Sequence, residues 1–446
     1  MMVVMDRRHF LKTSTSASLA ALMVGRGFAQ TTLGPLFESE SLAGNAAGQA
    51  DLRIGLIGCG GRGTGAASQA LSTVGGVRLV AMGDAFSDRL ESSLVSLQQY
   101  HPDTVDVPPE RRFCGFDAYQ QVIACDVDVL VIATPPGFRP LHFEAGVAAG
   151  KHIFMEKPVA VDGPGIRRVL AAAQVAKQKQ LKVGVGLQRH HQNSYLETIQ
   201  RLHAGEIGRI TLLRTYWNSA GVWVRPREQG QTEMEYQMRN WYYFNWLCGD
   251  HIVEQHIHNL DVGNWIMQGY PTEAQGQGGR LLRTGIDHGE IFDHHMVEYT
   301  YADGTRMLSQ CRHMPGCWSS VEEHAHGTEG TCDVSGARIR RHDQDKLHWR
   351  FEGDSPNAYQ VEHDDLFAAI RSGTSYNEAE YGAMSTMTAI LGRMATYCGK
   401  VVKMEDALAS SLALTPSAYA FDGTPPSLPD ADGRYPIPIP GVTKSY

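Results

Sequence analysis

Two short stretches of the sequence combine acids, a lysine and histidines at spacings that suit proton transfer. The first is Glu156-Lys157-Pro158, and the second runs from Glu254 to Asp261. Glu254, His258 and Asp261 recur at i, i+4 and i+7, so a continuous helix would place them on one face. An imidazole titrates near neutral pH and therefore suits a general acid or base. We expect these residues to meet around a molecule that exchanges a proton.

A glycine-rich turn early in the chain predicts a site for a phosphorylated ligand. Residues 52–57 form a short β-rich run, and residues 64–71 have a helical composition. The turn between them has the pattern GxGxxG and contains Gly58, Gly60, Gly61, Arg62 and Gly63. In this context glycines allow a tight turn, close approach of the backbone to a pyrophosphate, and close packing of helix on strand. We therefore predict a dinucleotide-binding turn.

An acidic residue after the second predicted strand indicates which dinucleotide binds. Residues 77–82 form that strand, and Asp84 follows it about 20 residues after the glycines, where a carboxylate can accept hydrogen bonds from the ribose hydroxyls. A carboxylate there also repels a 2′-phosphate, so we predict NAD as the cofactor. Arg89 is close enough in sequence to keep NADP as the alternative.

The elements around these motifs alternate between strand and helix. A third apolar strand, residues 127–133, leads into Thr134-Pro135, where the chain must turn beside the nicotinamide half of the ligand. A helix over residues 142–150 and a strand over residues 151–154 are expected next. Alternating strands and helices predict an α/β fold with a doubly wound (Rossmann) parallel sheet.

These motifs, in this order and spacing, resemble the Gfo/Idh/MocA family of oxidoreductases. The resemblance implies a second α+β domain with a large open, mostly antiparallel sheet, and it places Lys157 between the nicotinamide and a substrate hydroxyl. The implied cofactor-binding residues are Gly58, Gly60, Gly61, Arg62, Gly63, Asp84, Thr134, Pro135, Glu156 and Lys157.

The stretch from Glu254 to Asp261 resembles the family's second signature, an acid followed by a histidine and an aspartate. It departs from that signature because Glu254 stands where the family commonly has Asp, and His256 where it commonly has Gly. We predict His258 as the general acid or base and Lys157 as the group that polarises or deprotonates the hydroxyl. Glu254 is predicted to orient the imidazole or to bind a neighbouring hydroxyl. Asp261 is predicted to be catalytic in a secondary role.

The residues before this stretch suggest a pocket for a polyhydroxylated substrate. Residues 240–246 are rich in aromatics, and we name Trp241 and Tyr242 as candidates for stacking on a sugar ring, with burial in the core as the alternative. Asp250 and His251 would extend the polar helix face and read hydroxyl groups. The predicted substrate is a sugar, glycoside or cyclitol.

The density of histidines raises the question of a metal. His251 and its neighbours offer imidazoles and acids of the kind that bind zinc. Members of the family generally hold no metal, and we therefore predict none. The eight cysteines contain no CxxC pair and are expected to be buried thiols.

The remaining sequence completes the expected domain plan. A strand over 209–216, a hairpin over 296–312, strands near 319–326 and 346–351, and helices over 360–371 and 378–399 fit the second domain. The predicted segments are a signal peptide (1–29), a linker (30–50), a Rossmann domain (51–170), a substrate and oligomerisation domain (171–400) and an extended C-terminal arm (401–446). The family likeness implies a homo-oligomer through the open sheet.

The first residues predict export. Arg7-Arg8 precede an apolar, small-residue stretch that ends in Gly27-Phe28-Ala29, which resembles a twin-arginine signal with its cleavage site. The apolar run is too short for a permanent membrane anchor. We therefore expect a periplasmic protein, in a compartment without a free pool of NAD, so the cofactor would have to stay bound.

Composition excludes several other classes of protein. The chain has 446 residues, 42% of them apolar and 20% charged, which is the range of ordinary globular proteins. Its net charge of −8 is spread without a basic block, so nucleic acid is not an expected partner.

Three functions fit these observations. The first is an exported oxidoreductase that acts on a secondary hydroxyl of a sugar, glycoside or cyclitol. The second is a redox-neutral, NAD-dependent glycosidase or lyase that works through a transient keto-sugar. The third, from another class, is a carbohydrate-binding protein without turnover.

Overall fold

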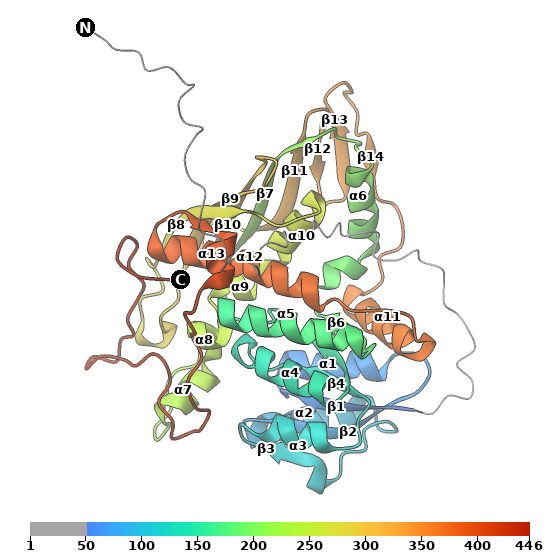
Figure 1. Ribbon diagram of the computed structural model, residues 1–446, viewed down its shortest axis with the longest axis vertical. Helices are drawn as coiled ribbons and strands as arrows, with labels where there is room; N and C mark the ends of the chain where they lie inside the picture. The colour runs from blue at the N-terminus through green and yellow to red at the C-terminus, as the bar shows by residue number, and fades with distance from the viewer. Residues whose placement is uncertain (1–50) are drawn as a thin grey trace, which may run out of the picture.

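The computed structural model describes residues 51–446 and contains two β-sheets joined by packed helices (Figure 1). The predicted signal peptide and linker, residues 1–50, lie outside the described residues. The two sheets correspond to the two domains expected from the sequence.

The first sheet is parallel and has six strands in the order β3-β2-β1-β4-β5-β6. Its strands are β1 (Leu52–Ile57), β2 (Val77–Asp84), β3 (Arg112–Cys114), β4 (Val129–Ile132), β5 (His152–Met155) and β6 (Val183–Val185). This order is that of a dinucleotide-binding Rossmann sheet, in which ligands bind at the carboxyl ends of the strands. The predicted α/β fold is confirmed.

Helices cover both faces of this sheet, which explains why its central strands are almost continuously apolar. On one face lie α3 (Ala118–Ala124), α4 (Arg139–Ala148) and α5 (Gly163–Gln178). On the other lie α1 (Gly61–Leu71), α2 (Ser87–Tyr100) and, from far along the chain, α11 (Ala358–Ser372). The predicted domain end at residue 170 is therefore too early, because β6 belongs to this sheet and α11 packs against it.

The second sheet has nine strands in the order β14-β13-β12-β11-β7-β10-β9-β8-β15. They are β7 (Ile210–Ser219), β8 (Glu273–Gly279), β9 (His294–Thr300), β10 (Arg306–His313), β11 (Ser320–Gly327), β12 (Gly330–Asp333), β13 (Arg338–Arg341), β14 (Trp349–Arg350) and β15 (Val402–Lys403). Neighbours are antiparallel except β7 and β10, which run parallel. This matches the large, mostly antiparallel sheet predicted from the family resemblance.

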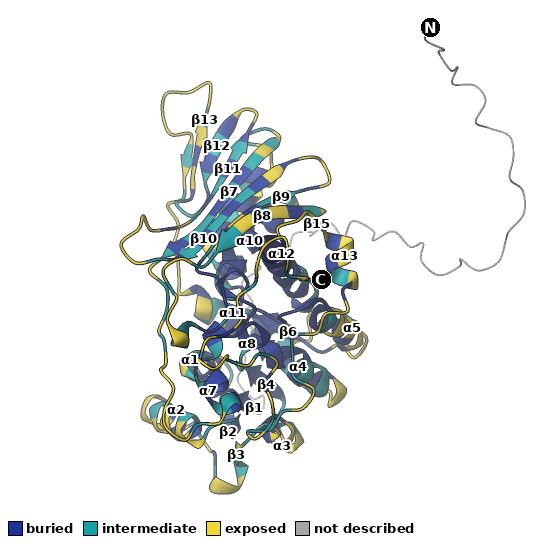
Figure 2. Ribbon diagram, turned by 90° about the vertical axis from the view of Figure 1, so that its left-hand side faces the viewer, coloured by how far each residue is buried: buried dark blue, intermediate teal, exposed yellow. Residues whose placement is uncertain are grey.

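One face of this sheet packs on helices, and the other faces away from them. The covering helices are α6 (Asn193–His203), α10 (Ile257–Met267) and α12 (Ala379–Cys398). Along β10 every second residue is buried, as expected where alternate side chains face the core. Figure 2 shows the same alternation of buried and more exposed residues across the sheet.

Short helices and 3-10 turns lie in the connections between the longer elements. They are α7 (Glu233–Arg239), α8 (Asn245–Cys248), α9 (His251–Glu254) and α13 (Met404–Ala409), with the 3-10 turns η1 (Pro109–Arg111), η2 (Pro136–Phe138), η3 (Gln188–His191), η4 (Trp241–Tyr243) and η5 (Ile286–His288). The long helix α12 lies against α5 of the first domain and against β8 of the second. It therefore fixes the two layers relative to each other.

The predicted C-terminal arm, residues 401–446, begins instead with β15 and α13, so the part without helix or strand starts at residue 410. Residues 410–446 contain no helix or strand. They pack on their own chain: the Thr232 hydroxyl donates a hydrogen bond to the Phe421 carbonyl at 2.6 Å, and the rings of Tyr435 and Phe244 lie 4.9 Å apart. The arm thus covers the region of α7 and α8.

Candidate active site

The glycine turn between β1 and α1 has the shape of a cradle for phosphate groups. Gly58 has φ +93°, and a Cβ there would lie 2.6 Å from the Thr134 nitrogen. A Cβ on Gly63 would lie 1.9 Å from the Gly58 oxygen, so this glycine allows the helix to pack on the turn. By contrast, a Cβ on Gly60 or Gly61 would meet no atom within 4 Å. The backbone at these two glycines is open to a ligand, which fits the pyrophosphate of a dinucleotide.

Asp84 closes the other side of this cradle. It is the last residue of β2, and its carboxylate accepts hydrogen bonds from the N–H groups of Cys59 at 2.6 Å and Phe86 at 2.9 Å. Burial raises the pKa of Asp84, although these two hydrogen bonds oppose the shift. Arg89 lies 3.8 Å from Asp88 in an ion pair. The predicted acid is therefore in contact with the predicted glycine turn.

An ion pair connects the glycine turn to the Glu-Lys-Pro segment. Arg62 Nε lies 2.7 Å from Glu156 Oε1, and the Glu156 side chain is almost completely buried. The ring of Tyr359, from α11, lies 5.1 Å from the Arg62 guanidinium carbon. The first and third cofactor motifs of the sequence thus form one continuous surface.

The turn after β4 lies beside the same surface. The Thr134 hydroxyl and His142 Nδ1 are 3.1 Å apart, and burial lowers the pKa of His142 to about 3. Pro135 precedes η2, in which a Cβ on Gly137 would lie 2.0 Å from the Trp246 carbonyl oxygen. The turn is therefore packed directly against α8.

Lys157 and Glu254 meet at the junction of the two domains. The Lys157 ammonium donates a hydrogen bond to the Glu254 carbonyl oxygen at 2.6 Å and lies 3.3 Å from Glu254 Oε1. Their side chains are only 13% and 14% exposed. The lysine follows β5 of the Rossmann sheet, whereas the acid ends α9, so domain packing creates this pair.

His258 belongs to the same group of residues. It lies in α10 and is 6% exposed, and its ring stacks on that of Trp217 at 5.9 Å. Burial, together with the positive charges of Lys157 and Arg189, lowers the pKa of His258 well below its ordinary value. The imidazole is therefore neutral at neutral pH and able to accept a proton.

The single helix face predicted for Glu254, His258 and Asp261 is wrong. The helix is broken, because α9 ends at Glu254 and α10 begins at Ile257. Every residue from Ile257 to Ile266 is buried, so α10 has no polar face toward solvent. Glu254 therefore contacts Lys157 from the end of α9, whereas His258 lies in the next helix, α10.

Asp261 is held apart from this group by other partners. Its carboxylate accepts hydrogen bonds from Ser385 Oγ at 2.7 Å and His190 Nε2 at 2.8 Å. The His190 ring stacks on Trp265 at 4.1 Å. These contacts give Asp261 a packing role between α10 and α12, and none of them involves Lys157.

The aromatic stretch is mostly core. Tyr242, Tyr243, Phe244 and Trp246 are each at most 2% exposed, so the core interpretation holds for them. Trp241 is half-buried and lies 5.9 Å from the ring of Trp223, which is 41% exposed. Only this tryptophan of the predicted stacking pair reaches the surface.

Asp250 and His251 are not at the surface either. Both are 0% exposed, and Asp250 accepts hydrogen bonds from the Phe292 N–H at 2.9 Å and the Tyr397 hydroxyl at 2.5 Å. The predicted reading of substrate hydroxyls by these side chains finds no support in this position.

Two buried arginines beside the reactive group were not predicted. Arg139 donates to the Ile132 carbonyl at 2.9 Å, and burial lowers its pKa to about 10 despite the charges of Glu156 and Glu254. Arg189 forms a buried ion pair with Glu323. Neither arginine belongs to a motif, so only the packing of distant segments reveals them.

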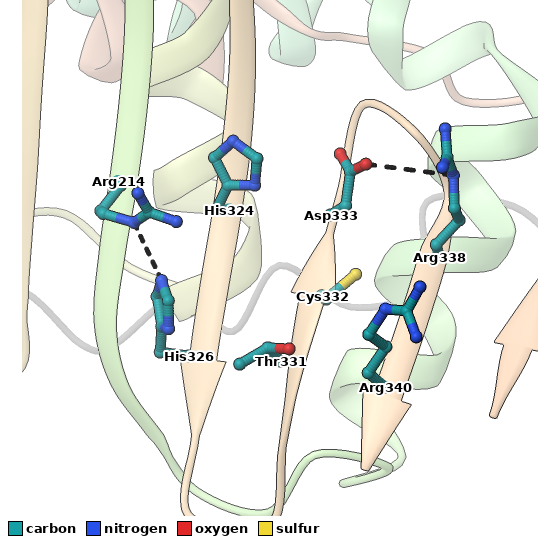
Figure 3. A pocket seen from close by; sticks show the side chains of 8 residues that line it. All are labelled: Arg214, His324, His326, Thr331, Cys332, Asp333, Arg338 and Arg340. Atoms are coloured by element: carbon teal, nitrogen blue, oxygen red, sulfur yellow. Dashed lines mark hydrogen bonds and ion pairs between the residues drawn. The ribbon is translucent and has the colours of Figure 1, made fainter. Parts of the chain in front are cut away.

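A separate hollow lies on the second, nine-stranded sheet and contains none of the predicted site residues. Its volume is about 230 Å³. Figure 3 shows that its lining comes from β7, β11, β12 and β13, and these residues are Arg214, His324, His326, Thr331, Cys332, Asp333, Arg338 and Arg340. Arg214 and Asp333 already pair with His326 and Arg338. The chemistry of the motifs is therefore located between the domains and not in this hollow.

Across residues 51–446 the helices are all too short or too polar to span a bilayer.

Comparison with known proteins agrees with the fold and the cofactor. Residues 52–187 match the GFO_IDH_MocA family, an oxidoreductase family with an NAD-binding Rossmann fold. Inositol 2-dehydrogenase 4 of Saccharopolyspora erythraea is 31% identical over 172 residues, which are 39% of this chain and 47% of the relative. Inositol 2-dehydrogenase of Klebsiella pneumoniae is 26% identical over 257 residues, which are 57% of this chain and 65% of that relative. The chain thus spans about half to two thirds of the curated relatives it matches.

Solved structures show the same two-domain architecture. The aldose-aldose oxidoreductase from Caulobacter crescentus, complexed with glycerol, superposes with a TM-score of 0.61 at 18% identity, over 79% of this chain and all of that one. The scyllo-inositol dehydrogenase from Lactobacillus casei, with bound NAD(H) and scyllo-inositol, superposes with a TM-score of 0.60 at 22% identity. The match covers 80% of this chain and all of that one. The predicted fold is confirmed, and the Rossmann domain is of the NAD-binding kind.

Proposed function

We propose that this chain, whose Rossmann domain belongs to the Gfo/Idh/MocA oxidoreductase family, oxidises or reduces a secondary hydroxyl of a sugar, glycoside or cyclitol with NAD. The observation that carries the proposal is the meeting of Lys157 and Glu254 at 3.3 Å between the NAD-binding domain and the second domain. The names of the inositol dehydrogenase relatives support the substrate class.

Oxidation of an alcohol requires an acceptor for the hydride on carbon and an acceptor for the hydroxyl proton. Bound NAD would supply the first at its nicotinamide ring, held by the glycine turn, Asp84 and Glu156. The protein itself has to supply the second. The site therefore needs a neutral base next to a cationic group.

His258 and Lys157 meet these two requirements. A neutral imidazole can take the hydroxyl proton, and the low pKa caused by its burial keeps it neutral. The Lys157 ammonium stabilises the alkoxide that develops as the proton leaves. Glu254 holds that ammonium through its backbone carbonyl and its carboxylate.

The buried surroundings support a reaction that must exclude water. His258 and Lys157 are both largely buried, and Arg139 and Arg189 are buried as well. Positive charge in a region of low dielectric stabilises an oxyanion more than it would in water. It also raises the cost of protonating His258, in agreement with the direction of its pKa shift.

We further propose that the protein is exported to the periplasm with its cofactor bound. The support is the Arg7-Arg8 motif followed by a short apolar stretch. Changing both arginines to lysine should leave the precursor in the cytoplasm, which fractionation followed by immunoblotting would detect. Export of that double variant at the normal level would contradict the proposal.

The first experiment is to purify the mature protein, denature it, and identify and count the released nicotinamide nucleotide. The intact protein is then mixed with myo-inositol, glucose and nitrophenyl glycosides, and the absorbance of reduced nicotinamide is followed, with and without a second sugar as acceptor. We expect at least one cyclitol or aldose to reduce the bound nicotinamide in the wild-type protein. The Lys157→Ala variant should show no such reduction. Release of nitrophenol without net reduction would favour the redox-neutral glycosidase instead. Sugar binding without either reaction would favour a carbohydrate-binding protein.

A further inference from the structure

A buried cluster of two histidines and one aspartate lies at the start of the short helix that ends at Glu254. Asp250 and His251 stand at the start of α9, the short helix that ends at Glu254, and His295 comes from β9 of the second sheet. Each of the three is at most 2% exposed. One donor atom from each of them lies within 4.8 Å of the other two.

The distances within this cluster suit a metal ion. His295 Nε2 lies 3.2 Å from Asp250 Oδ1, and His251 Nε2 lies 3.8 Å from the same oxygen. Tetrahedral zinc with bonds of about 2.0–2.1 Å separates its ligand atoms by about 3.3 Å. The two separations, 3.2 and 3.8 Å, bracket that value.

Asp250 Oδ1 accepts one hydrogen bond, from the His251 backbone N–H at 2.5 Å, and a carboxylate oxygen keeps a second lone pair for another ligand. His295 Nδ1 is bonded to Thr396 Oγ1 at 2.9 Å, which orients the ring so that Nε2 faces Asp250. The other carboxylate oxygen of Asp250 is occupied by the Phe292 N–H and the Tyr397 hydroxyl. Outer contacts of this kind are those that orient metal ligands.

His251 is the residue that lacks partners. Both of its ring nitrogens are buried and neither has a hydrogen-bond partner. A buried polar atom without a partner costs about 1–3 kcal/mol, so such atoms call for an explanation. In addition, Asp250 has φ +75°, a backbone region that residues other than glycine rarely adopt and that is found at functional sites.

We propose that Asp250, His251 and His295 bind a zinc ion. One carboxylate oxygen and two imidazole nitrogens form a donor set that zinc prefers. The proposal replaces the prediction, made from the sequence, that the protein holds no metal.

The ion would fix the position of a residue in the reaction. It would tie the first residues of α9 to β9, and the same helix ends at Glu254, which contacts Lys157. This consequence rests on the proposed function, whereas the binding of zinc does not. The metal is therefore structural, and Asp250, His251 and His295 are positioning residues.

The test measures metal directly in the purified holoprotein, after removal of any affinity tag. We expect about one zinc per chain by plasma mass spectrometry after dialysis, and visible d–d absorption of tetrahedral Co²⁺ when cobalt replaces it. His251→Gln and His295→Gln should each lower the bound zinc at least tenfold. His363→Gln is the matched control, because His363 is equally buried with two unpartnered ring nitrogens but lies in α11, outside the cluster.

The cobalt experiment on the wild-type protein does not depend on the folding of any variant. A wild-type protein that is folded by circular dichroism, contains no zinc and takes up neither Zn²⁺ nor Co²⁺ after treatment with a chelator would overturn the proposal. Equal zinc in the wild type and in the two cluster variants would also overturn it. Because metal content is measured without turnover, failure here is distinct from failure of the proposed dehydrogenase activity.

Discussion

The substitution Gly60→Ala should weaken NADH binding while leaving the stability of the fold nearly unchanged. Gly60 precedes α1, and a Cβ at this position meets no protein atom within 4 Å. Its backbone is extended, with φ −71° and ψ 179°, so alanine fits without strain. The only space that the methyl group occupies is the one we assign to the pyrophosphate.

The magnitude follows from that geometry. A methyl group forced into a well-packed contact costs about 1–3 kcal/mol, which corresponds to a loss of about 5- to 150-fold in affinity for NADH. The free energy of unfolding of the protein without nucleotide should change by about 1 kcal/mol or less, because alanine at a helix N-cap is only mildly unfavourable.

The assay compares Gly60→Ala with two other glycine variants on the same helix. NADH affinity is measured by fluorescence titration, and stability by urea unfolding without nucleotide. Gly65→Ala is the control, since its Cβ meets only the flexible end of Arg62 at 3.7 Å, and it should bind NADH normally. Gly63→Ala should be destabilised outright, because its Cβ would lie 1.9 Å from the Gly58 oxygen. Unchanged NADH affinity in Gly60→Ala would refute the placement of the pyrophosphate.

Three further changes probe the junction and the core. Lys157→Ala should lower kcat about 100-fold or more, and Glu254→Gln should lower kcat about tenfold, both with NADH affinity nearly unchanged. A loss of NADH affinity as large as the loss of kcat would argue against these roles. The acid limb of kcat/KM should lie well below pH 6.5, because the pKa of His258 is lowered, and a midpoint at or above pH 6.5 would contradict His258 as the base. Although burial opposes it, Glu378 and Asp365 raise the pKa of His191 to about 10, so its stabilising contribution is complete below pH 6.5 and is lost as the pH rises through 10. Between pH 7 and pH 9 the free energy of unfolding should fall by about 2–3 kcal/mol more in the wild type than in His191→Gln, as measured by urea unfolding at each pH.

The Rossmann half could be predicted from the sequence because its signals are local. The strand, glycine turn and helix from β1 to α1 are consecutive, and the spacing to Asp84 is fixed by one further strand. The contacts of Asp84 with the Cys59 N–H and of Glu156 with Arg62 are what this local order produces. Only the end of the domain was misplaced, because α11 returns to it from far along the chain.

The second half of the site could be predicted only in part. A periodicity of i, i+4 and i+7 assumes an unbroken helix, whereas the chain turns at Gln255 and His256. The His256 side chain is held there by a hydrogen bond between its Nε2 and Oγ of Ser309, a residue of β10, at 2.7 Å. No local pattern announces a break that depends on a residue so distant in sequence.

The break has a consequence for how the site is built. With one continuous helix, Glu254 would lie one turn from His258 and would move with α10. Instead Glu254 is carried by α9, a helix of four residues that cannot be stable by itself. Its position depends on what holds its first residues, and these are Asp250, with its bonds to Phe292 and Tyr397, and His251 beside His295.

The buried polar residues near the reactive pair can be understood from this requirement. A short helix packed only by apolar side chains could shift with little loss of contact, whereas a carboxylate fixed by directional bonds has one position. Asp250 accepts such bonds from two segments far apart in sequence, namely from Phe292 before β9 and from Tyr397 near the end of α12. The same α12 packs on α5 of the NAD-binding domain, which follows Lys157 in sequence. The 3.3 Å separation between Lys157 and Glu254 is therefore set from both domains through α12, so a change in the core of α12 should alter kcat without touching substrate or cofactor.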